Sequence, residues 1–234
     1  MSLKITYQSR FLQAILLIIL VGFFSTPLFE RVELSMRDMV LRVSNPPVLK
    51  LNSSVNVIDI DDKSLAELGR WPWPRDVVSD LLNTLRDDYG VVHIGLDIIF
   101  PDLTNNSEKL TESLSRGGIT GAFIWHPEKL PNQGEFPHQV FCKNCNDFIN
   151  PKGWVTNSGL HVNPDLAHIT PIVDMDGVVR KIPTLVCKKN KCVEALGVQL
   201  ARKILFTTNV YRLKANARGI KVLESSDGIM SLPI

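Results

Sequence analysis

The fold is decided by residues 55–100, which read VNVIDIDDKSLAELGRWPWPRDVVSDLLNTLRDDYGVVHIGLDIIF. The β-branched run at 55–60 and the apolar run at 91–100 predict two buried strands. Between them, Pro74 at a first helical position and the closing Gly90 bound an apolar stripe with helical spacing. Two buried strands joined by a helix form a right-handed, parallel βαβ unit. We therefore expect an α/β fold whose mixed sheet opens with this unit.

The N-terminal region carries the strongest hydropathy signal. Residues 11–29 read FLQAILLIILVGFFSTPLF without a charge, and as a helix they would span about 28 Å, close to the hydrocarbon thickness of a bilayer. Lys4 and Arg10 precede this run, so the positive-inside rule keeps residues 1–10 in the cytoplasm. We predict one N-terminal transmembrane helix at 11–29. A cleaved signal peptide is the alternative, although Gly22–Ser25 lacks a small-x-small cleavage site.

A helix just outside the membrane is predicted next, at 30–47. Apolar residues recur at helical spacing between Val32 and Val43, and Pro46 and Pro47 end the pattern. This stripe could pair two copies of the chain, so we expect a homodimer. Residues 48–234 are predicted to form one extracytoplasmic domain.

Several later elements of that domain also have a sequence signal. Residues 107–115 are compatible with a helix, 119–125 and 178–187 with strands, and Asp176-Gly177 with a tight turn. The face shared by Val193, Leu196, Leu200 and Ile204 predicts a closing helix.

Composition excludes several classes of protein. The 234 residues are 44% hydrophobic and 21% charged, which is typical of a globular chain and not of a disordered one. The formal net charge of +2 is too small to indicate nucleic-acid binding. The group formed by Lys188, Lys189 and Lys191 is interpreted as a solvated turn.

Four cysteines occur as two close pairs, Cys142/Cys145 and Cys187/Cys192. In an oxidising compartment they would form two structural disulfides, for which three connectivities are possible. Local pairing is preferred, because Cys187 and Cys192 flank a hairpin tip. The alternatives are a four-thiolate zinc site and redox chemistry at the CxxC motif of Cys142 and Cys145. We predict disulfides and no metal site.

Acidic residues lie at or near the ends of the two predicted strands. In open α/β sheets, ligands bind beyond the carboxyl ends of strands, so Asp59, Asp61 and Asp97 could hold a cation or a cationic ligand. The plainer interpretation is that the neighbouring Asp62 caps a turn while these three carboxylates pair with Arg70 or Arg75, since a lone buried carboxylate is costly.

The heptapeptide GRWPWPR at 69–75 is the most unusual part of the sequence. Two prolines fix its backbone, and two indoles flanked by guanidinium groups provide a potential recognition surface. Alternatively, the segment is a rigid connector whose tryptophans plug the edge of the core. The candidate ligand-binding residues are Asp59, Asp61, Arg70, Trp71, Trp73, Arg75 and Asp97.

Catalytic motifs are missing from the sequence. The five histidines form no HExxH motif, and GxSxG, the P-loop and GxGxxG do not occur. The acidic segment at 174–177 resembles a calcium loop, but Ile172 and Pro183 would occupy its first and twelfth ligand positions. We therefore predict that the chain is not an enzyme and needs no cofactor.

The stretch from Val55 to Arg75 resembles the signature of the CHASE2 family. The resemblance continues through Ile94–Phe100 and returns in DMDGVVRKIP at 174–183, so that it covers most of residues 30–206. It implies an extracytoplasmic sensor domain, at the front of bacterial adenylate cyclases, diguanylate cyclases and kinases, that binds an unknown small ligand.

In that family, further transmembrane helices and a cytoplasmic output module follow the sensor domain. This chain stops at Ile234 without them, so we expect a fragment, a truncated product or an isolated sensor. The implied location is the bacterial inner membrane, with the main domain facing the periplasm. The rival hypotheses are an envelope interaction module that senses nothing and a periplasmic thiol or metal protein.

Overall fold

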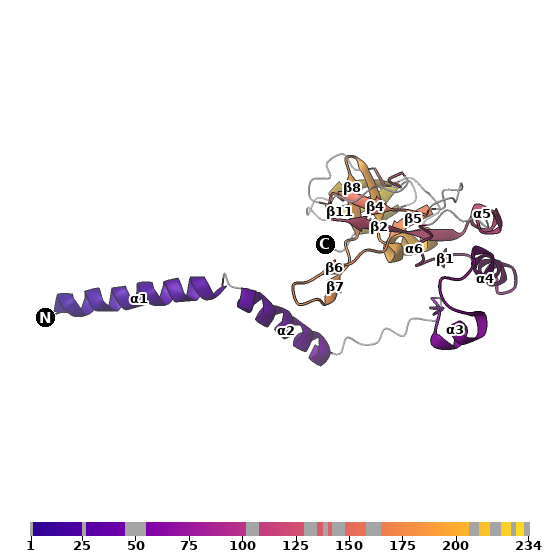
Figure 1. Cartoon of the computed structure of the whole chain (residues 1–234). Coiled ribbons are helices and arrows are strands. Elements are labelled where there is room, and N and C mark those ends of the chain that lie inside the picture. Colours follow the sequence, from indigo (N-terminus) through magenta and orange to yellow (C-terminus); the bar gives the residue numbers. More distant parts are fainter. Residues whose placement is uncertain are drawn as a thin grey trace. The chain divides into compact units, whose positions relative to one another are not determined.

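In a computed structural model, the chain folds into two compact units (Figure 1). The first contains Met1–Ile60 and Asp174–Val178, and the second contains Asp61–Val173 and Val179–Ile234. The structure describes residues 2–24, 27–44, 55–101, 108–128, 135–137, 140–141, 148–157, 165–205, 211–215, 221–225 and 228–231.

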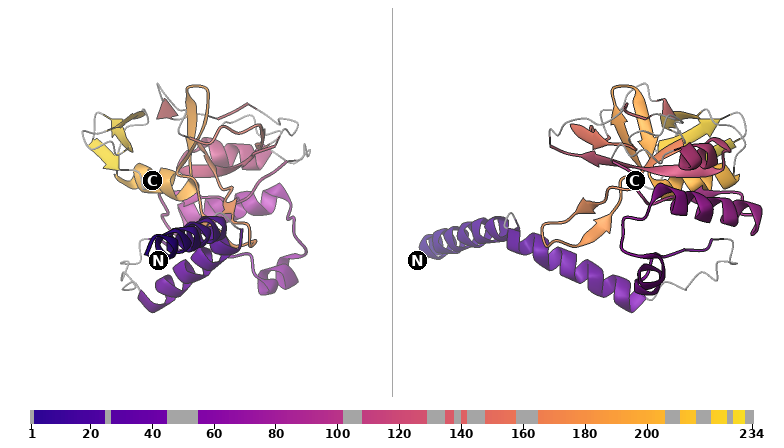
Figure 2. Two further views of the ribbon diagram at one scale, coloured as in Figure 1. Left: turned by 90° about the vertical axis from the view of Figure 1, so that its left-hand side faces the viewer. Right: turned by 45° about the vertical axis from the view of Figure 1, so that its right-hand side comes forward.

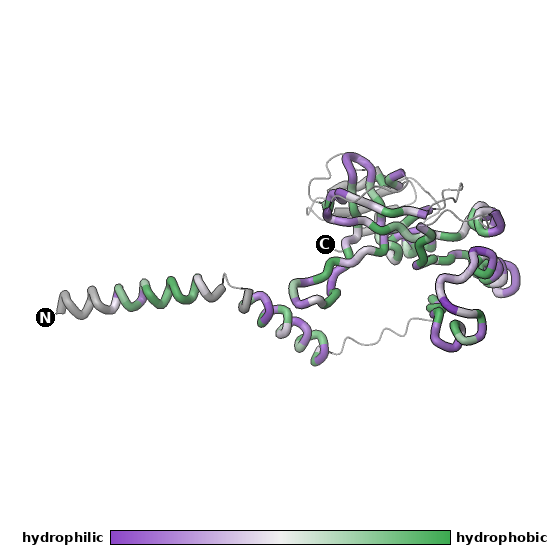
Figure 3. Tube along the Cα trace, viewed as in Figure 1, coloured by the Kyte–Doolittle hydropathy of each residue, from purple (hydrophilic) through white to green (hydrophobic). Residues whose placement is uncertain are grey.

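The first unit contains two helices, α1 (Ser2–Phe24) and α2 (Pro27–Ser44). Figure 3 shows the apolar run along α1 and the mixed composition of α2. In α2 the side chain of Arg37 lies 3.7 Å from that of Glu33, one helical turn away. Leu34 is buried, whereas the apolar side chains between Met36 and Val43 are exposed. Residues 30–44 of the predicted helix at 30–47 thus belong to α2, and residues 45–47 lie outside the described residues. The pairing of two copies through this helix stays a prediction.

The predicted transmembrane helix at 11–29 is wrong. Helix α1 ends at Phe24 and a separate helix begins at Pro27, whose ring cannot donate a backbone hydrogen bond to a preceding turn. The uncharged run inside α1 therefore extends only about 21 Å, against roughly 30 Å for the bilayer core. Within the described ranges, no helix combines the length and the hydropathy that a membrane span requires.

The turn at Asp174–Val178 confirms the prediction at Asp176-Gly177. Gly177 has a φ of 80°, in the left-handed region that favours glycine, and its N–H donates to the Asp174 carbonyl at 2.9 Å. The Val178 N–H donates to the Asp176 carboxylate at 3.1 Å. Asp174 and Asp176 thus belong to a tight turn.

The first sheet of the second unit is mixed, as predicted. Its long strand β2 (Ile119–His126) runs parallel to β1 (Ile94–Gly95) and β5 (Asp165–His168) and antiparallel to β4 (Gly153–Val155). Ile94 faces Ile119 in the register, and Trp125 faces Trp154.

The predicted opening βαβ unit is not formed. Residues 55–60 are not assigned to a strand, and Val57 is 90% exposed. The predicted strand at 91–100 pairs only at Ile94–Gly95, although Leu96 and Phe100 are buried. An apolar run indicates that its residues tend to be buried. Residues outside regular secondary structure can also be buried, so burial does not require pairing with another strand. The short helix α3 (Asp62–Leu68) and the predicted helix, α4 (Arg75–Asp87), are both present.

The second sheet has the strand order β12-β11-β10-β3-β9-β8. Two isolated bridges flank the sheets: Ile149 pairs with Val186 of β8, and His168 of β5 pairs with Ala195, which follows β9. The strands are β3 (Val140–Phe141), β8 (Leu185–Lys188), β9 (Lys191–Glu194), β10 (Tyr211–Ala215), β11 (Lys221–Ser225) and β12 (Gly228–Ser231), and a separate hairpin pairs β6 (Ile172–Val173) with β7 (Val179–Lys181).

Three helices cover parts of these sheets. Figure 2 shows α4 and α5 (Glu108–Ser115) beside one another, and the hydroxyls of Ser79 and Ser113 lie 2.7 Å apart between them. The closing helix α6 (Leu196–Leu205) packs on β1, where a Cβ added to Gly95 would lie 2.6 Å from Leu200 Cδ1. One core contains Val78, Leu82, Leu96, Phe100, Leu110, Leu114 and Ile119, and another contains Phe123, Trp125, Trp154, Leu166, Val186 and Val193.

Candidate functional site

The two tryptophans of the GRWPWPR segment differ in exposure. Trp73 is buried, and its indole N–H donates to the Gly69 carbonyl at 2.8 Å. Trp71 is 41% exposed and meets Trp73 edge to face, with ring centroids 5.9 Å apart. One indole therefore plugs the core edge, and the other is open to a binding partner.

Arg75 is buried at the start of α4. Its guanidinium carbon lies 5.5 Å from the centroid of the Phe100 ring, a cation–π contact. The Phe100 N–H in turn donates to the Asn157 side-chain carbonyl at 2.9 Å. The predicted pairing of Arg75 with Asp61 or Asp97 stays a prediction.

The predicted acidic residues have different surroundings. Asp61 caps α3, where it accepts hydrogen bonds from the Ser64 N–H at 2.8 Å and from the Ser64 hydroxyl at 2.7 Å. These bonds lower the pKa of Asp61. Asp97 is exposed, and Asp59 is exposed in the first unit. The structure thus brings the two indoles together, and Arg75 contacts Phe100. Arg70 and these three carboxylates lie at the surface.

A buried ion pair lies under α6, and the sequence analysis missed it. The Arg202 side chain makes contacts of 2.7 to 2.8 Å with both carboxylate oxygens of Glu194 on β9. Both side chains are at most 2% exposed. The bidentate geometry is the strong form of this interaction.

More polar side chains surround this pair. On α6, Lys203 donates to the Thr120 hydroxyl of β2 at 2.9 Å and forms an ion pair with Asp165 of β5. Gln199 of α6 and His168 of β5 are fully buried. Among the described residues, the Gln199 amide has no hydrogen-bond partner. The His168 ring nitrogens make no hydrogen bond of good geometry, although the Pro183 carbonyl lies close enough to favour the protonated ring. We call the set Thr120, Asp165, His168, Glu194, Gln199, Arg202 and Lys203 the polar cluster.

Burial shifts the pKa of two members of the polar cluster. Loss of solvent lowers the pKa of His168 to about 4, against the opposing effect of the Pro183 carbonyl. Burial raises the pKa of Glu194, and the hydrogen bonds from Arg202 oppose that shift. The spacing of Gln199 and Arg202, three residues apart on one helical face, is the sequence signal that could have revealed the cluster.

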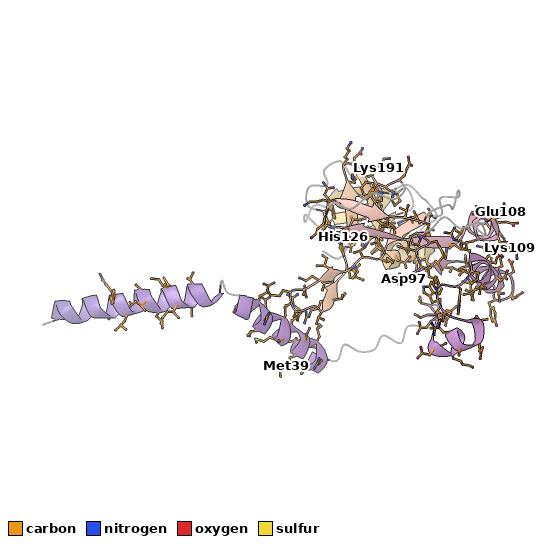
Figure 4. The ribbon with its side chains drawn as sticks, in the orientation of Figure 1. Met39, Asp97, Glu108, Lys109, His126 and Lys191 are labelled. Atoms are coloured by element: carbon orange, nitrogen blue, oxygen red, sulfur yellow. A yellow bond between two sulfur atoms is a disulfide. The ribbon has the colours of Figure 1, made fainter. Side chains whose placement is uncertain are left out.

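A hollow of about 270 Å³ lies elsewhere in the second unit, at the tip of the β8–β9 hairpin. It is lined by Glu135, Phe136, Trp154 and the hairpin residues Lys188–Lys191. Figure 4 places Lys191 and the predicted site residue Asp97 on opposite sides of the sheets. The sequence analysis had interpreted these lysines as a solvated turn only.

The predicted bond between Cys187 and Cys192 is confirmed. These residues face each other across the β8–β9 hairpin, with a Cα–Cα distance of 4.1 Å and an S–S distance of 2.03 Å. The other predicted pair, Cys142 and Cys145, lies outside the described residues. In the described part of the chain, no group of three or more His, Cys, Asp or Glu side chains could hold a metal ion.

Comparison with known proteins gives one match. The family model described as the CHASE2 domain matches residues 14–232. No curated protein and no solved structure matches the chain.

Proposed function

The chain belongs to the CHASE2 family of sensory domains, and we propose that it is the extracytoplasmic signal-input domain of a bacterial signalling protein. Its output would be an adenylate cyclase, a diguanylate cyclase or a kinase.

The polar cluster is the observation that carries a sensory mechanism. A buried ion pair stabilises a fold weakly, because desolvation offsets most of the Coulomb attraction. The buried amide of Gln199, which no described residue hydrogen-bonds, adds further cost. A core of this kind favours two packings of similar free energy, which is what a ligand needs in order to shift a population.

Helix α6 is the element that would move between these packings. It contributes Gln199, Arg202 and Lys203 to the polar cluster, and the partners of Arg202 and Lys203 come from the sheets. A displacement of α6 therefore changes every charged contact in the cluster together. Such a concerted change gives two discrete states in place of a gradual deformation.

The rival hypothesis of a thiol or metal protein loses its main support. The disulfide between Cys187 and Cys192 removes two of the four cysteines from a four-thiolate zinc site. No specific contact favours the envelope interaction module.

A receptor fusion tests the proposed function. The chain replaces the sensor domain of a CHASE2-containing diguanylate cyclase, and cyclic di-GMP is measured in cells. We expect the cyclic di-GMP concentration in cells with the fusion to differ severalfold from that in cells whose receptor lacks the inserted domain. The two receptors are compared at equal protein level. A receptor with an inactivated cyclase provides the background. Equal cyclic di-GMP with and without the domain would overturn the proposal.

A further inference from the structure

We propose that the hollow at the tip of the β8–β9 hairpin binds a small organic anion with a flat apolar body, of which an aromatic carboxylate is the simplest. Only the idea that this anion is the sensed cue rests on the proposed function. Binding itself can be measured independently of any output.

The charges around the hollow favour an anion. Lys188, Lys189 and Lys191 stand within four consecutive positions, and among the described residues of the lining Glu135 alone is acidic. Like charges held this close raise the electrostatic free energy of the empty hairpin tip. A bound carboxylate would lower it and accept charge-assisted hydrogen bonds from the ammonium groups.

The wall of the hollow favours a flat apolar body. Trp154 and Phe136 meet edge to face with ring centroids 5.4 Å apart, and Phe136 meets Phe123 in the same way at 5.5 Å. The ammonium of Lys188 lies 3.8 Å from the Trp154 ring centroid. An aromatic ring placed here would stack against the wall with its acid group beside the lysines.

The hairpin tip is held rigidly for such a role. The disulfide closes it, and β9 also pairs with β3 through Cys192 and Val140. Lys189 has a φ of 56°, a left-handed conformation that costs a non-glycine residue on the order of 1 kcal/mol. Glycine would adopt this φ at no steric cost, so the turn itself does not require lysine. Lysine at this position adds a positive charge at the rim of the hollow.

The size of the hollow limits the ligand. A volume of about 270 Å³ lies just under the range of roughly 300–1,000 Å³ that is usual for sites of drug-sized molecules. One ring with one acid group fits this space, and a folded partner does not.

Fluorine NMR of the full chain with 4-fluorobenzoate as the probe tests the inference. We expect saturable binding with a Kd on the order of 1 mM or tighter, and weakening by added salt. The uncharged isostere 4-fluorobenzamide should bind at least about tenfold more weakly, because it forms no charge-assisted bond.

Two variants identify the site. Lys188→Gln/Lys191→Gln should weaken 4-fluorobenzoate about tenfold or more at an unchanged melting temperature. The matched control Lys181→Gln, on the exposed strand β7, should bind as the wild type does. No saturable binding, equal affinity for the benzamide, or wild-type affinity in the double variant would each overturn the inference.

These outcomes separate the two proposals. If the anion binds at the hollow while the fusion output does not depend on the domain, the sensory function fails and the site remains. If the output depends on the domain and 4-fluorobenzoate does not bind, only the inferred ligand class fails.

Discussion

At the scale of single residues, Glu194 and Arg202 hold each other in the core through contacts of 2.7 to 2.8 Å. Arg202→Leu would leave the Glu194 carboxylate buried without its partner, so we expect the free energy of unfolding to fall by about 3–5 kcal/mol. Glu194→Leu/Arg202→Leu removes both charges and should recover most of that loss. Urea unfolding measures both variants, and a double variant no more stable than Arg202→Leu would contradict this account.

His168 gives the domain a pH-dependent stability. Its pKa is lowered from 6.5 to about 4 by burial, so the unfolded chain takes up the proton at higher pH than the folded chain. The stability contributed by neutral His168 is thus present above pH 6.5 and is lost as the pH falls, by about 3 kcal/mol at pH 4.

The difference between two proteins isolates this effect. Glu194 is present in both the wild type and His168→Leu, so its contribution cancels in the comparison. From pH 7 to pH 4 the unfolding free energy of the wild type should fall by about 3 kcal/mol more than that of His168→Leu, because only the wild type loses the His168 contribution. Parallel curves would show that His168 does not carry the effect.

At the scale of elements, the β8–β9 hairpin depends on its disulfide. The closed loop between Cys187 and Cys192 is short, so Cys187→Ser/Cys192→Ser should lower the free energy of unfolding by only about 2 kcal/mol. Extracytoplasmic placement adds an expectation in cells: the bond should form in the wild type and should be lost when the periplasmic thiol oxidase is absent. Non-reducing peptide mapping of the chain from both kinds of cells shows whether the bond has formed. Free thiols in wild-type cells would count against export.

The elements that could be predicted were those whose sequence pattern has one structural solution. The stripe behind α4 fixes a helix and its buried face, and the spacing of Cys187 and Cys192 fits a hairpin. The closing helix is present as α6, but its predicted face is wrong: Val193 lies in β9 and Ile204 is 61% exposed, whereas the helix buries Gln199 and Arg202. The strand at 55–60 could not be decided in this way, since its apolar residues do not specify a pairing partner. At the site, the sequence offered Trp73 as a candidate ligand contact and, alternatively, as a core plug, and its burial favours the plug. The ion pair of Glu194 and Arg202 was missed, because charged residues are seldom fully buried.

At the scale of the whole molecule, the chain belongs to a family of sensory domains, and the proposed mechanism places the conformational change at the polar cluster. The amide of Gln199 is fully buried, and no described residue hydrogen-bonds it. Gln199→Met fills the same space without an unsatisfied polar group, so it should raise the free energy of unfolding by about 1 kcal/mol or more. Because it favours one packing of α6, it should also shift the signalling equilibrium.

The most direct test is cyclic di-GMP in cells that carry the receptor fusion, measured for the wild type and for Gln199→Met, with the melting temperature of each purified chain. Ala201→Gln, on the exposed face of α6, serves as the control and should change neither quantity. The account predicts that Gln199→Met melts at a higher temperature and holds cyclic di-GMP at a level clearly different from the wild type. A more stable Gln199→Met chain with wild-type cyclic di-GMP would contradict it.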